Sequence, residues 1–237
     1  MQDREPYQIK GIMLAYNLFQ TLFSTWMFME GWGFYVSGGY NWHCEPVDYS
    51  NSPSAMRALN LAWWYFFSKF IDLFDSFFFV ARKKFGHLSA LHVIHHSTLP
   101  WLCWWGPRFV GGGQSGFGPF LNSGVHTVMY LYYLLAACGP QVQKYLWWKK
   151  YLTTLQLVQF VLVFLHALQP LMFTCDYPIA ASLMFAFTGV QYFFLFMAFY
   201  KKAYSSKPSE VKSHTNGSQA IVNNNYVVKN KGVKKED

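Results

Sequence analysis

Six long apolar stretches alternate with shorter polar segments along this chain. They cover residues 11–35, 58–81, 88–105, 117–138, 151–171 and 179–200. A helix needs about 20 apolar residues to cross a bilayer, and the stretches are close to that length. The third is the shortest, and Pro100 interrupts it. The pattern predicts an all-α integral membrane protein with six transmembrane helices.

The basic residues support an even number of crossings. Lysines and arginines accumulate in cytosolic loops, and with both chain ends in the cytosol most of the 19 lie on that side. They include the clusters Arg82–Lys84 and Lys149–Lys150. Losing one span would scatter these clusters over both sides of the membrane. We therefore expect both termini in the cytosol.

The composition excludes several classes of protein. Of the 237 residues 53% are hydrophobic, 21% aromatic and 13% charged, whereas soluble domains carry about 25% charged residues. A soluble monomer of this composition would lack polar surface. The net charge of +8 comes from the loops and tail on one side of the membrane, so we expect no nucleic-acid partner. Four cysteines are too few for a disulfide-stapled scaffold.

The chain changes character after the last apolar stretch. We expect a transmembrane domain at residues 1–204 and a disordered cytosolic tail at 205–237, because the tail is polar and lacks apolar periodicity. Lys234 and Lys235 stand four and three residues from the end. Lysines at these positions of a cytosolic tail are typical of a receptor-read address for the endoplasmic reticulum, a class of short terminal signal.

The second apolar stretch carries three charges near its middle, Lys69, Asp72 and Asp75. Each costs about 2.5 to 3.5 kcal/mol at the centre of a membrane, which the apolar residues of the stretch hardly offset. Spacings of three residues put all three on one helix face, with Lys69 and Asp72 close enough to pair. They are expected to face a polar interior; the alternative is a purely structural ion pair.

Three further stretches each present polar side chains on one face, at helical spacings of three, four or seven residues. Such groups are costly in lipid, so the four polar faces predict a bundle with a wet or reactive centre. They are His92, His95 and His96 in the third stretch, Asn122, His126 and Tyr130 in the fourth, and Gln156, Gln159 and His166 in the fifth.

Two chemistries use clustered histidines within a membrane. A dinuclear iron site would need about eight imidazole ligands, but only five of the 8 histidines lie within the spans, so a di-iron oxygenase or desaturase is the less favoured alternative. In acyl transfer an imidazole acts as nucleophile or base, and amide or hydroxyl groups stabilise the oxyanion. Asp72 or Asp75 is placed to hold such an imidazole in the required tautomer.

Four ordered motifs give these residues a family. KFIDLFDS at 69–76, HVIHH at 92–96, NSGVHTVMYLYY at 122–133 and KKYLTTLQLVQF at 149–160 resemble the ELO family of very-long-chain fatty acid elongases. The resemblance covers nearly the whole chain up to about residue 204. It implies an endoplasmic-reticulum enzyme that condenses an acyl-CoA with malonyl-CoA to a 3-oxoacyl-CoA, with release of CO2 and CoA. It also implies six helices in a barrel-like bundle around an acyl tunnel.

The same resemblance implies roles for the polar residues. His95 would attack the thioester to form an acyl-imidazole, while His126 and Asn122 stabilise the enolate or oxyanion. Four residues would orient and tune these imidazoles: His92, His96, Asp72 and Asp75. A further set would shape the polar site and the CoA entrance: Lys69, Tyr130, Gln156 and Gln159, with Lys149 and Lys150 at the CoA phosphates.

The resemblance implies no cofactor beyond the two CoA substrates and no metal. Its partners would be the bilayer, other copies or other elongases, and enzymes of the elongation cycle. Cys44 and Cys175 stand at matching family positions outside the cytosol, where an oxidising lumen would join them in a disulfide. Acyl length and unsaturation preference are not readable from the sequence.

The chain also departs from the family pattern. The family usually has seven helices, and the resemblance implies that the first of them is missing from the segment that begins at Met1. Asp72 and Ser76 replace the family's usual Glu and Thr. A non-catalytic, shortened subunit that associates with longer elongases is therefore a second alternative to the condensing enzyme.

Overall fold

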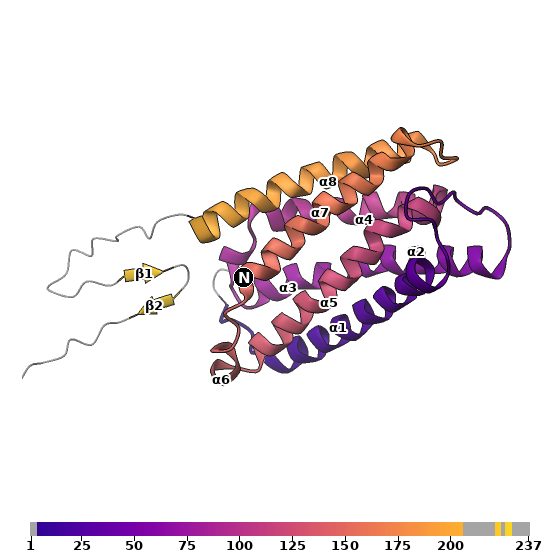
Figure 1. Cartoon of the computed structure of the whole chain (residues 1–237). Helices are drawn as coiled ribbons and strands as arrows, with labels where there is room; N and C mark the ends of the chain where they lie inside the picture. The colour runs from indigo at the N-terminus through magenta and orange to yellow at the C-terminus, as the bar shows by residue number, and fades with distance from the viewer. Residues whose placement is uncertain (1–3, 206–220, 224–225, 229–237) are drawn as a thin grey trace, which may run out of the picture. The chain divides into compact units, whose positions relative to one another are not determined.

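The computed structural model describes residues 4–205, 221–223 and 226–228, and it divides into two units, Met1–Phe196 and Met197–Asp237. The first unit is helical (Figure 1). Its helices, of which the last continues into the second unit, are α1 (Lys10–Trp32), α2 (Pro53–Ile71), α3 (Leu73–Ala81), α4 (Ala90–Phe109), α5 (Phe117–Ala137), α6 (Pro140–Gln143), α7 (Lys149–Met172) and α8 (Ile179–Tyr200).

Local sequence explains where several helices begin. The Ser52 side chain accepts a hydrogen bond from the Ala55 amide at 3.1 Å, and Pro53 occupies the first turn of α2, where its missing N–H costs nothing. Ser89 caps α4 in the same way, accepting from the His92 amide at 3.3 Å. α4 continues through Pro100 and Pro107 to Phe109, so Pro100 does not end this helix.

The second apolar stretch is not one uninterrupted helix. α2 ends at Ile71 and α3 begins at Leu73, with Asp72 between them. The Asp72 amide still donates to the Ser68 carbonyl at 2.9 Å, whereas the Asp75 amide donates back only to Asp72, at 3.2 Å. The ladder therefore tightens for one turn where the charged residues stand.

Only part of the expected membrane architecture is evident from helix composition. α7 and the segment Ile179–Tyr204, which contains α8, are long and apolar enough to cross a membrane, each with a mean hydropathy of 1.7. The remaining long helices match the predicted stretches in position but carry more polar side chains. These helical apolar segments are consistent with a membrane protein.

Packing contacts show which helices of the first unit are neighbours. α1 packs along α5, α5 along α7, and α2 along α4. Tyr192 of α8 contacts α4 through His95, with ring centroids 5.0 Å apart, and α7 through Phe160, at 5.9 Å. Each of these six helices thus contacts two others, because α1 also meets α2.

Three loops gather at one end of the first unit. A disulfide joins Cys44, after α1, to Cys175, after α7. The Gln114 amide donates to the Glu45 carbonyl at 2.7 Å, and the Glu45 amide donates to the Gln114 side chain at 3.1 Å. We call this the disulfide end. The loop of Gln114 passes close to the loop of Glu45 at Gly113. A glycine is needed there, because its φ is +58° and a Cβ would lie 2.6 Å from the Pro46 carbonyl oxygen.

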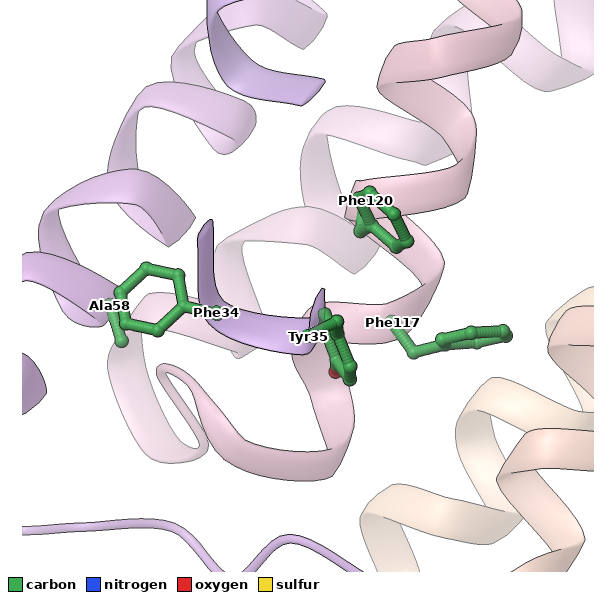
Figure 2. Packing of buried hydrophobic residues seen from close by; sticks show 5 residues of the cluster. All are labelled: Phe34, Tyr35, Ala58, Phe117 and Phe120. Atoms are coloured by element: carbon green, nitrogen blue, oxygen red, sulfur yellow. The ribbon is translucent and has the colours of Figure 1, made fainter. Parts of the chain in front are cut away.

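An aromatic core lies close to the disulfide end. Phe34 and Tyr35 come from the π-helical turn Gly33–Ser37 that extends α1, and Phe117 and Phe120 come from the start of α5 (Figure 2). The rings of Tyr35 and Phe120 stack with centroids 5.4 Å apart. Aromatic pairs of this kind each add about 0.5 to 1.5 kcal/mol beyond the area they bury, so the cluster fixes α1 against α5.

The second unit comprises the end of α8, a π-helical turn Lys201–Ser205 and two short strands. β1 (Ile221–Asn223) pairs antiparallel with β2 (Tyr226–Val228), with Ile221 opposite Val228. These residues fall in the tail that the sequence predicts to be disordered, and the disorder of the tail stays a prediction. Lys234 and Lys235 lie outside the described residues.

Candidate active site

A buried ion pair stands at the junction of α2 and α3. Lys69 Nζ lies 3.1 Å from Asp72 Oδ2, and the side chains of the two residues are 2% and 6% exposed. Lys69 Nζ also lies 4.5 Å from the centre of the Tyr65 ring. Burying two charges is costly unless every remaining lone pair and proton finds a partner. The surroundings of Asp72 show how this condition is met.

The second oxygen of Asp72 is bound by α1 and α5. Gln20 Nε2 donates to Asp72 Oδ1 at 2.6 Å, and the Tyr130 hydroxyl donates to the same oxygen at 3.0 Å. Gln20 is itself 3.3 Å from the hydroxyl of Tyr16, which donates to the Ile71 carbonyl. Three helices therefore hold one carboxylate. Sequence reasoning missed Gln20 and Tyr16, although Tyr16, Gln20 and Ser24 form a polar row at steps of four along an apolar helix.

Tyr130 joins the two carboxyl groups. Its hydroxyl lies 3.0 Å from Asp72 Oδ1 and 3.0 Å from Asp75 Oδ2, and its side chain is fully buried. A phenol has a single proton and can donate to one of these oxygens at a time. The other contact is a hydrogen bond only if that carboxyl carries a proton and donates to the phenol. Because Asp72 has the Lys69 charge, Asp75 is the natural holder of that proton.

The three histidines of α4 divide into two groups. His92 and His96 stack with centroids 4.1 Å apart, and Ser76 Oγ lies 2.8 Å from His92 Nε2. His96 Nδ1 has no hydrogen-bond partner among the described residues. His95 instead faces Tyr192 and Phe196 of α8, with centroid distances of 5.0 and 5.8 Å. His95 therefore has a different environment from its two neighbours.

Asn122 connects the ion pair with this histidine region. Its Oδ1 accepts hydrogen bonds from the Tyr65 hydroxyl at 3.0 Å and from Lys69 Nζ at 3.3 Å. Its Nδ2 donates to Gln159 Oε1 over a longer 3.4 Å. His126 stands one turn further along α5, with Nδ1 4.0 Å from Asp72 Oδ2, which is beyond hydrogen-bond distance.

A mostly apolar cavity of about 150 Å³ opens beside these residues. We call it the main cavity. Of the three histidines of α4 only His95 lines it, and Asn122, Gln159 and Tyr65 line the same region. The cavity continues past Phe120 to Phe34 and Tyr35 of the aromatic core. Its volume holds on the order of ten water-sized groups, so it is a slot with polar groups at one side and aromatic walls beyond.

Basic residues gather at the opposite end from the disulfide. His87, in the turn between α3 and α4, is exposed, but partial desolvation of its ring lowers its pKa, helped by the positive charges of Lys149, Lys84 and Arg82. Lys149 and Lys150 are exposed at the start of α7. Gln156, one to two turns further along α7, has its Nε2 3.5 Å from Met129 Sδ. The structure thus brings the predicted loop cations together near His87.

The predicted site residues fall into three groups. Most surround the ion pair or the α4 histidines, as described above. His166 does not: it lies toward the disulfide end, stacked on Phe117 at 3.9 Å. Lys149 and Lys150 stand at the start of α7, and Gln156 contacts Met129. In the described part of the chain, no three His, Cys, Asp or Glu side chains are grouped as metal ligands would be.

The amino-acid sequence of this chain is similar to those of known proteins. The sequence model of the family described as ELO, the GNS1/SUR4 family, matches residues 1–212. A "Very long chain fatty acid elongase 7" of Drosophila melanogaster is 48% identical over 229 residues, covering 92% of this chain and 68% of the relative. A very long chain fatty acid elongase of Aedes aegypti is 49% identical over 210 residues, covering 87% and 58%.

A human protein is similar to this chain to nearly the same extent. "Very long chain fatty acid elongase 1" of Homo sapiens is 46% identical over 211 residues, covering 86% of this chain and 74% of the relative. This chain therefore spans between 58% and 74% of the length of these three relatives.

Proposed function

This chain belongs to the ELO family of GNS1/SUR4 proteins, and from that membership we propose that it is a condensing acyltransferase of very-long-chain fatty acid elongation. The reaction joins a long-chain acyl-CoA to malonyl-CoA and forms a 3-oxoacyl-CoA, CO2 and CoA. The observation that carries the proposal is that His95, a histidine of α4, lines an apolar cavity beside Asn122.

The first half-reaction is acyl transfer to His95. A neutral imidazole nitrogen attacks the thioester carbonyl, the carbon–sulfur bond breaks, and CoA leaves as its thiol with the proton lost by the ring. The ring regains a proton from solvent when the second half-reaction releases it. The acyl group then occupies the main cavity as an acyl-imidazole. His95 suits this role because it faces aromatic rings and the cavity, while His92 and His96 face each other.

The second half-reaction forms the carbon–carbon bond. Malonyl-CoA loses CO2, and the resulting enolate carbon attacks the acyl carbon and breaks its bond to the His95 nitrogen. A group that donates to the oxyanion lowers this barrier. Asn122 Nδ2 is placed for that role, because Oδ1 is held by Tyr65 and Lys69 while the Nδ2 bond to Gln159 is the longest of the three.

The ion pair serves to position these groups. Asp72 is held by Lys69, Gln20 and Tyr130, and Lys69 in turn holds Asn122. His126 lies near the same carboxylate, with its Nδ1 4.0 Å from Asp72 Oδ2, and we assign it to stabilising the enolate or oxyanion. We assign His92, His96 and Asp75 to the positioning role of the ion pair. The reaction as proposed requires no cofactor besides its two CoA substrates.

We further propose that the six long helices enclose the main cavity as a barrel across the endoplasmic-reticulum membrane. The neighbour contacts from α1 through α2, α4, α8, α7 and α5 support a closed ring. In this arrangement the Arg82–Lys84 and Lys149–Lys150 clusters, with His87, meet CoA on the cytosolic side, where the C-terminus also lies. Association with other elongases and elongation-cycle enzymes stays a prediction.

An elongation assay tests the activity. Membranes containing this chain should convert a long-chain acyl-CoA and labelled malonyl-CoA into labelled 3-oxoacyl-CoA with release of CO2. The substrate should be varied over chain length, since no residue yet fixes that preference. Membranes from the same cells without the chain give the background. Association with longer elongases but no turnover by the purified chain would favour a non-catalytic subunit.

A trapping experiment tests the proposed intermediate. The purified protein is incubated with a long-chain acyl-CoA in the absence of malonyl-CoA, digested, and analysed by mass spectrometry. The acyl mass should appear on the peptide containing His95, and addition of malonyl-CoA before digestion should remove it. An acyl group on another residue, with turnover intact, would contradict the assignment.

A further inference from the structure

A second, smaller pocket lies near the disulfide end of the first unit. Its volume is about 20 Å³, enough for one water-sized group, which needs about 10 to 15 Å³ on this measure. We call it the end pocket. It shares four lining residues with the main cavity and is therefore separated from it only by their side chains: Ser115, Gly118, Val163 and Phe185.

The end pocket is unusual in its polar groups. Three of its lining residues each carry a buried polar atom that has no hydrogen-bond partner among the described residues, namely His166 Nε2, Tyr177 OH and Ser182 Oγ. The residues are 7%, 4% and 1% exposed. Buried polar atoms in native proteins almost always have a partner. Three such atoms around one small space therefore indicate a polar ligand.

Hydrogen bonds fix what His166 offers to that ligand. The Glu45 amide donates to Gln114 Oε1 at 3.1 Å, so the NH2 group of Gln114 must face the other way. That group lies 3.3 Å from His166 Nδ1 and 3.1 Å from the His166 carbonyl. The same NH2 group also lies 3.4 Å from Gln169 Oε1, so its two protons are shared among three acceptors. Because an amide NH2 group cannot accept a hydrogen bond, the contact favours the tautomer in which Nδ1 is unprotonated and Nε2 carries the proton. His166 presents a donor to the end pocket.

The remaining groups define the chemistry of the ligand. The Ser182 hydroxyl both donates and accepts, and it completes a donor–acceptor pair with His166. The Tyr177 hydroxyl also has the Ser115 hydroxyl nearby, so the site rests chiefly on His166 and Ser182. No Lys or Arg is among the described residues that line the pocket, so an anion would be buried there without a counter-charge from them. A neutral hydroxyl, which accepts from His166 and donates to Ser182, meets each requirement.

The position of the end pocket connects it with the acyl chain. Gln159 lines the main cavity beside Asn122, and His166 is seven residues further along α7, which is about 10 Å at 1.5 Å per residue. A chain attached at His95 and running away from Asn122 toward the aromatic core approaches the wall shared by the two spaces. Its far terminus is thus the part of the substrate that meets the end pocket.

On the premise of the proposed elongase function, we propose that the end pocket binds the terminal hydroxyl of an acyl chain hydroxylated at its far end. Water supplies the same chemistry when the chain is shorter. A methyl terminus that displaced this water would leave His166 and Ser182 unpaired, which is unfavourable. The pocket therefore selects hydroxyl-terminated chains and stops methyl-terminated chains at one particular length.

The test compares two probes of equal carbon number, a methyl-terminated and a terminally hydroxylated acyl-CoA, over a series of chain lengths. Below the critical length both should be elongated equally. At that length the hydroxylated chain should have a kcat/KM about fivefold higher or more, since an unpaired buried group costs about that factor. Equal kcat/KM values at every length would mean that water alone occupies the pocket, and would overturn the proposal.

Two variants locate the effect. Ser182→Ala should abolish the preference for the hydroxylated chain while leaving the elongation of short methyl-terminated chains intact. Ser24→Ala is the matched control, because Ser24 is another buried helical serine but lines neither cavity. It should keep the preference. Loss of the preference in both variants, or in neither, contradicts the assignment to the end pocket.

A binding measurement separates this proposal from the proposed activity. Thioether analogues of the two acyl-CoA probes bind without reacting, and their effect on the thermal stability of the purified chain can be compared. The hydroxylated analogue should raise the Tm more at the critical length, and Ser182→Ala should remove the difference. If no acyl-CoA is elongated, the proposed function fails, yet this comparison still decides whether the end pocket binds the hydroxyl.

Discussion

Two buried polar regions, one around Asp72 and one around His166, are built on opposite rules. The Asp72 region contains charges, and the charged groups are matched: Lys69, Gln20 and Tyr130 all bind the carboxylate. The His166 region contains only neutral groups, and three of its atoms have no partner among the described residues. A buried charge without a partner costs far more free energy than a buried neutral polar group without one. The charges must therefore be paired within the protein, whereas the neutral groups can be left for a ligand to pair.

The comparison also concerns what holds each region in place. Around Asp72 the side chains themselves join α1, α2 and α5. Near His166 the backbone and a covalent bond do so, through the mutual hydrogen bonds of Glu45 and Gln114 and the disulfide of Cys44 with Cys175. Substitutions at the two ends should therefore affect activity and stability differently.

The largest effect is expected from His95→Ala. Without the proposed nucleophile the elongation rate should fall by about a thousandfold or more, in the upper range for a lost catalytic side chain. The free energy of unfolding should change little, because the contacts described for the His95 ring are with the rings of His96, Tyr192 and Phe196. His43→Ala, an exposed histidine at the disulfide end, is the control and should keep full activity. Activity remaining in His95→Ala would remove His95 from the mechanism.

Breaking the buried ion pair is expected to have the next largest effect. Asp72→Ala leaves the Lys69 charge uncompensated and should cost about 3 to 5 kcal/mol in the free energy of unfolding, measured by chemical denaturation in detergent. The double variant Lys69→Met/Asp72→Leu should recover most of that stability but no activity. Recovery of activity as well would show that the pair is merely structural.

Loss of the disulfide tests the other end. The double variant Cys44→Ser/Cys175→Ser should lower the free energy of unfolding by about 2 to 4 kcal/mol, and reducing agent should have the same effect on the wild type. Elongation measured well below the Tm should persist, because the Asp72 region is linked by side chains alone. The single exposed free cysteine Cys138 provides the control through Cys138→Ser. A complete loss of turnover at low temperature would show that the two ends are coupled.

A methyl group added to α1 should destabilise the protein only where α1 touches α5. A Cβ at Gly31 would lie 2.7 Å from Phe120 Cδ2, so Gly31→Ala should cost about 1 to 3 kcal/mol through overpacking. Gly11, in the same helix, has nothing within 4 Å of such a Cβ, and Gly11→Ala should be neutral or slightly stabilising. Thermal denaturation of the two variants side by side measures the difference.

The smallest effect is expected from Asp75→Asn. If Asp75 holds a proton and donates to Tyr130, an amide replaces it without a change in charge, and the free energy of unfolding should change by less than about 1 kcal/mol. Asp72→Asn removes a charge and should cost clearly more, by the same denaturation measurement. Equal costs for the two variants would show that Asp75 is ionised beside Asp72.

The apolar pattern predicted the positions of the long helices to within a few residues, because length and apolarity decide where a helix runs. It did not predict the interruption at Asp72, where local hydrogen bonding decides. Among the described helices, only α7 and the α8 segment are long and apolar enough to cross a membrane. Lys69 in α2 and the three histidines in α4 make these two helices less apolar. The functional residues themselves weaken the signal of the helices that carry them.

The candidate site was predictable in its charges and less so in its neutral partners. Lys69, Asp72 and the histidines are conspicuous because they are costly in an apolar stretch. Gln20 in α1 is a single amide and gives a weak signal, although it makes the shortest hydrogen bond to Asp72. His166 shares a helix with Gln156 and Gln159, but its role depends on Phe117, Gln114 and Ser182, which only the tertiary structure brings to it.

The link between Cys44 and Cys175 also sets a schedule for synthesis. The two cysteines are 131 residues apart, and at about 5 to 20 residues per second the second follows the first by on the order of ten seconds. Gln114, which binds Glu45, is made well before Cys175. The hydrogen bonds between Glu45 and Gln114 can therefore form before the disulfide does. Cys44 cannot pair with Cys175 until nearly all of the first unit has been made.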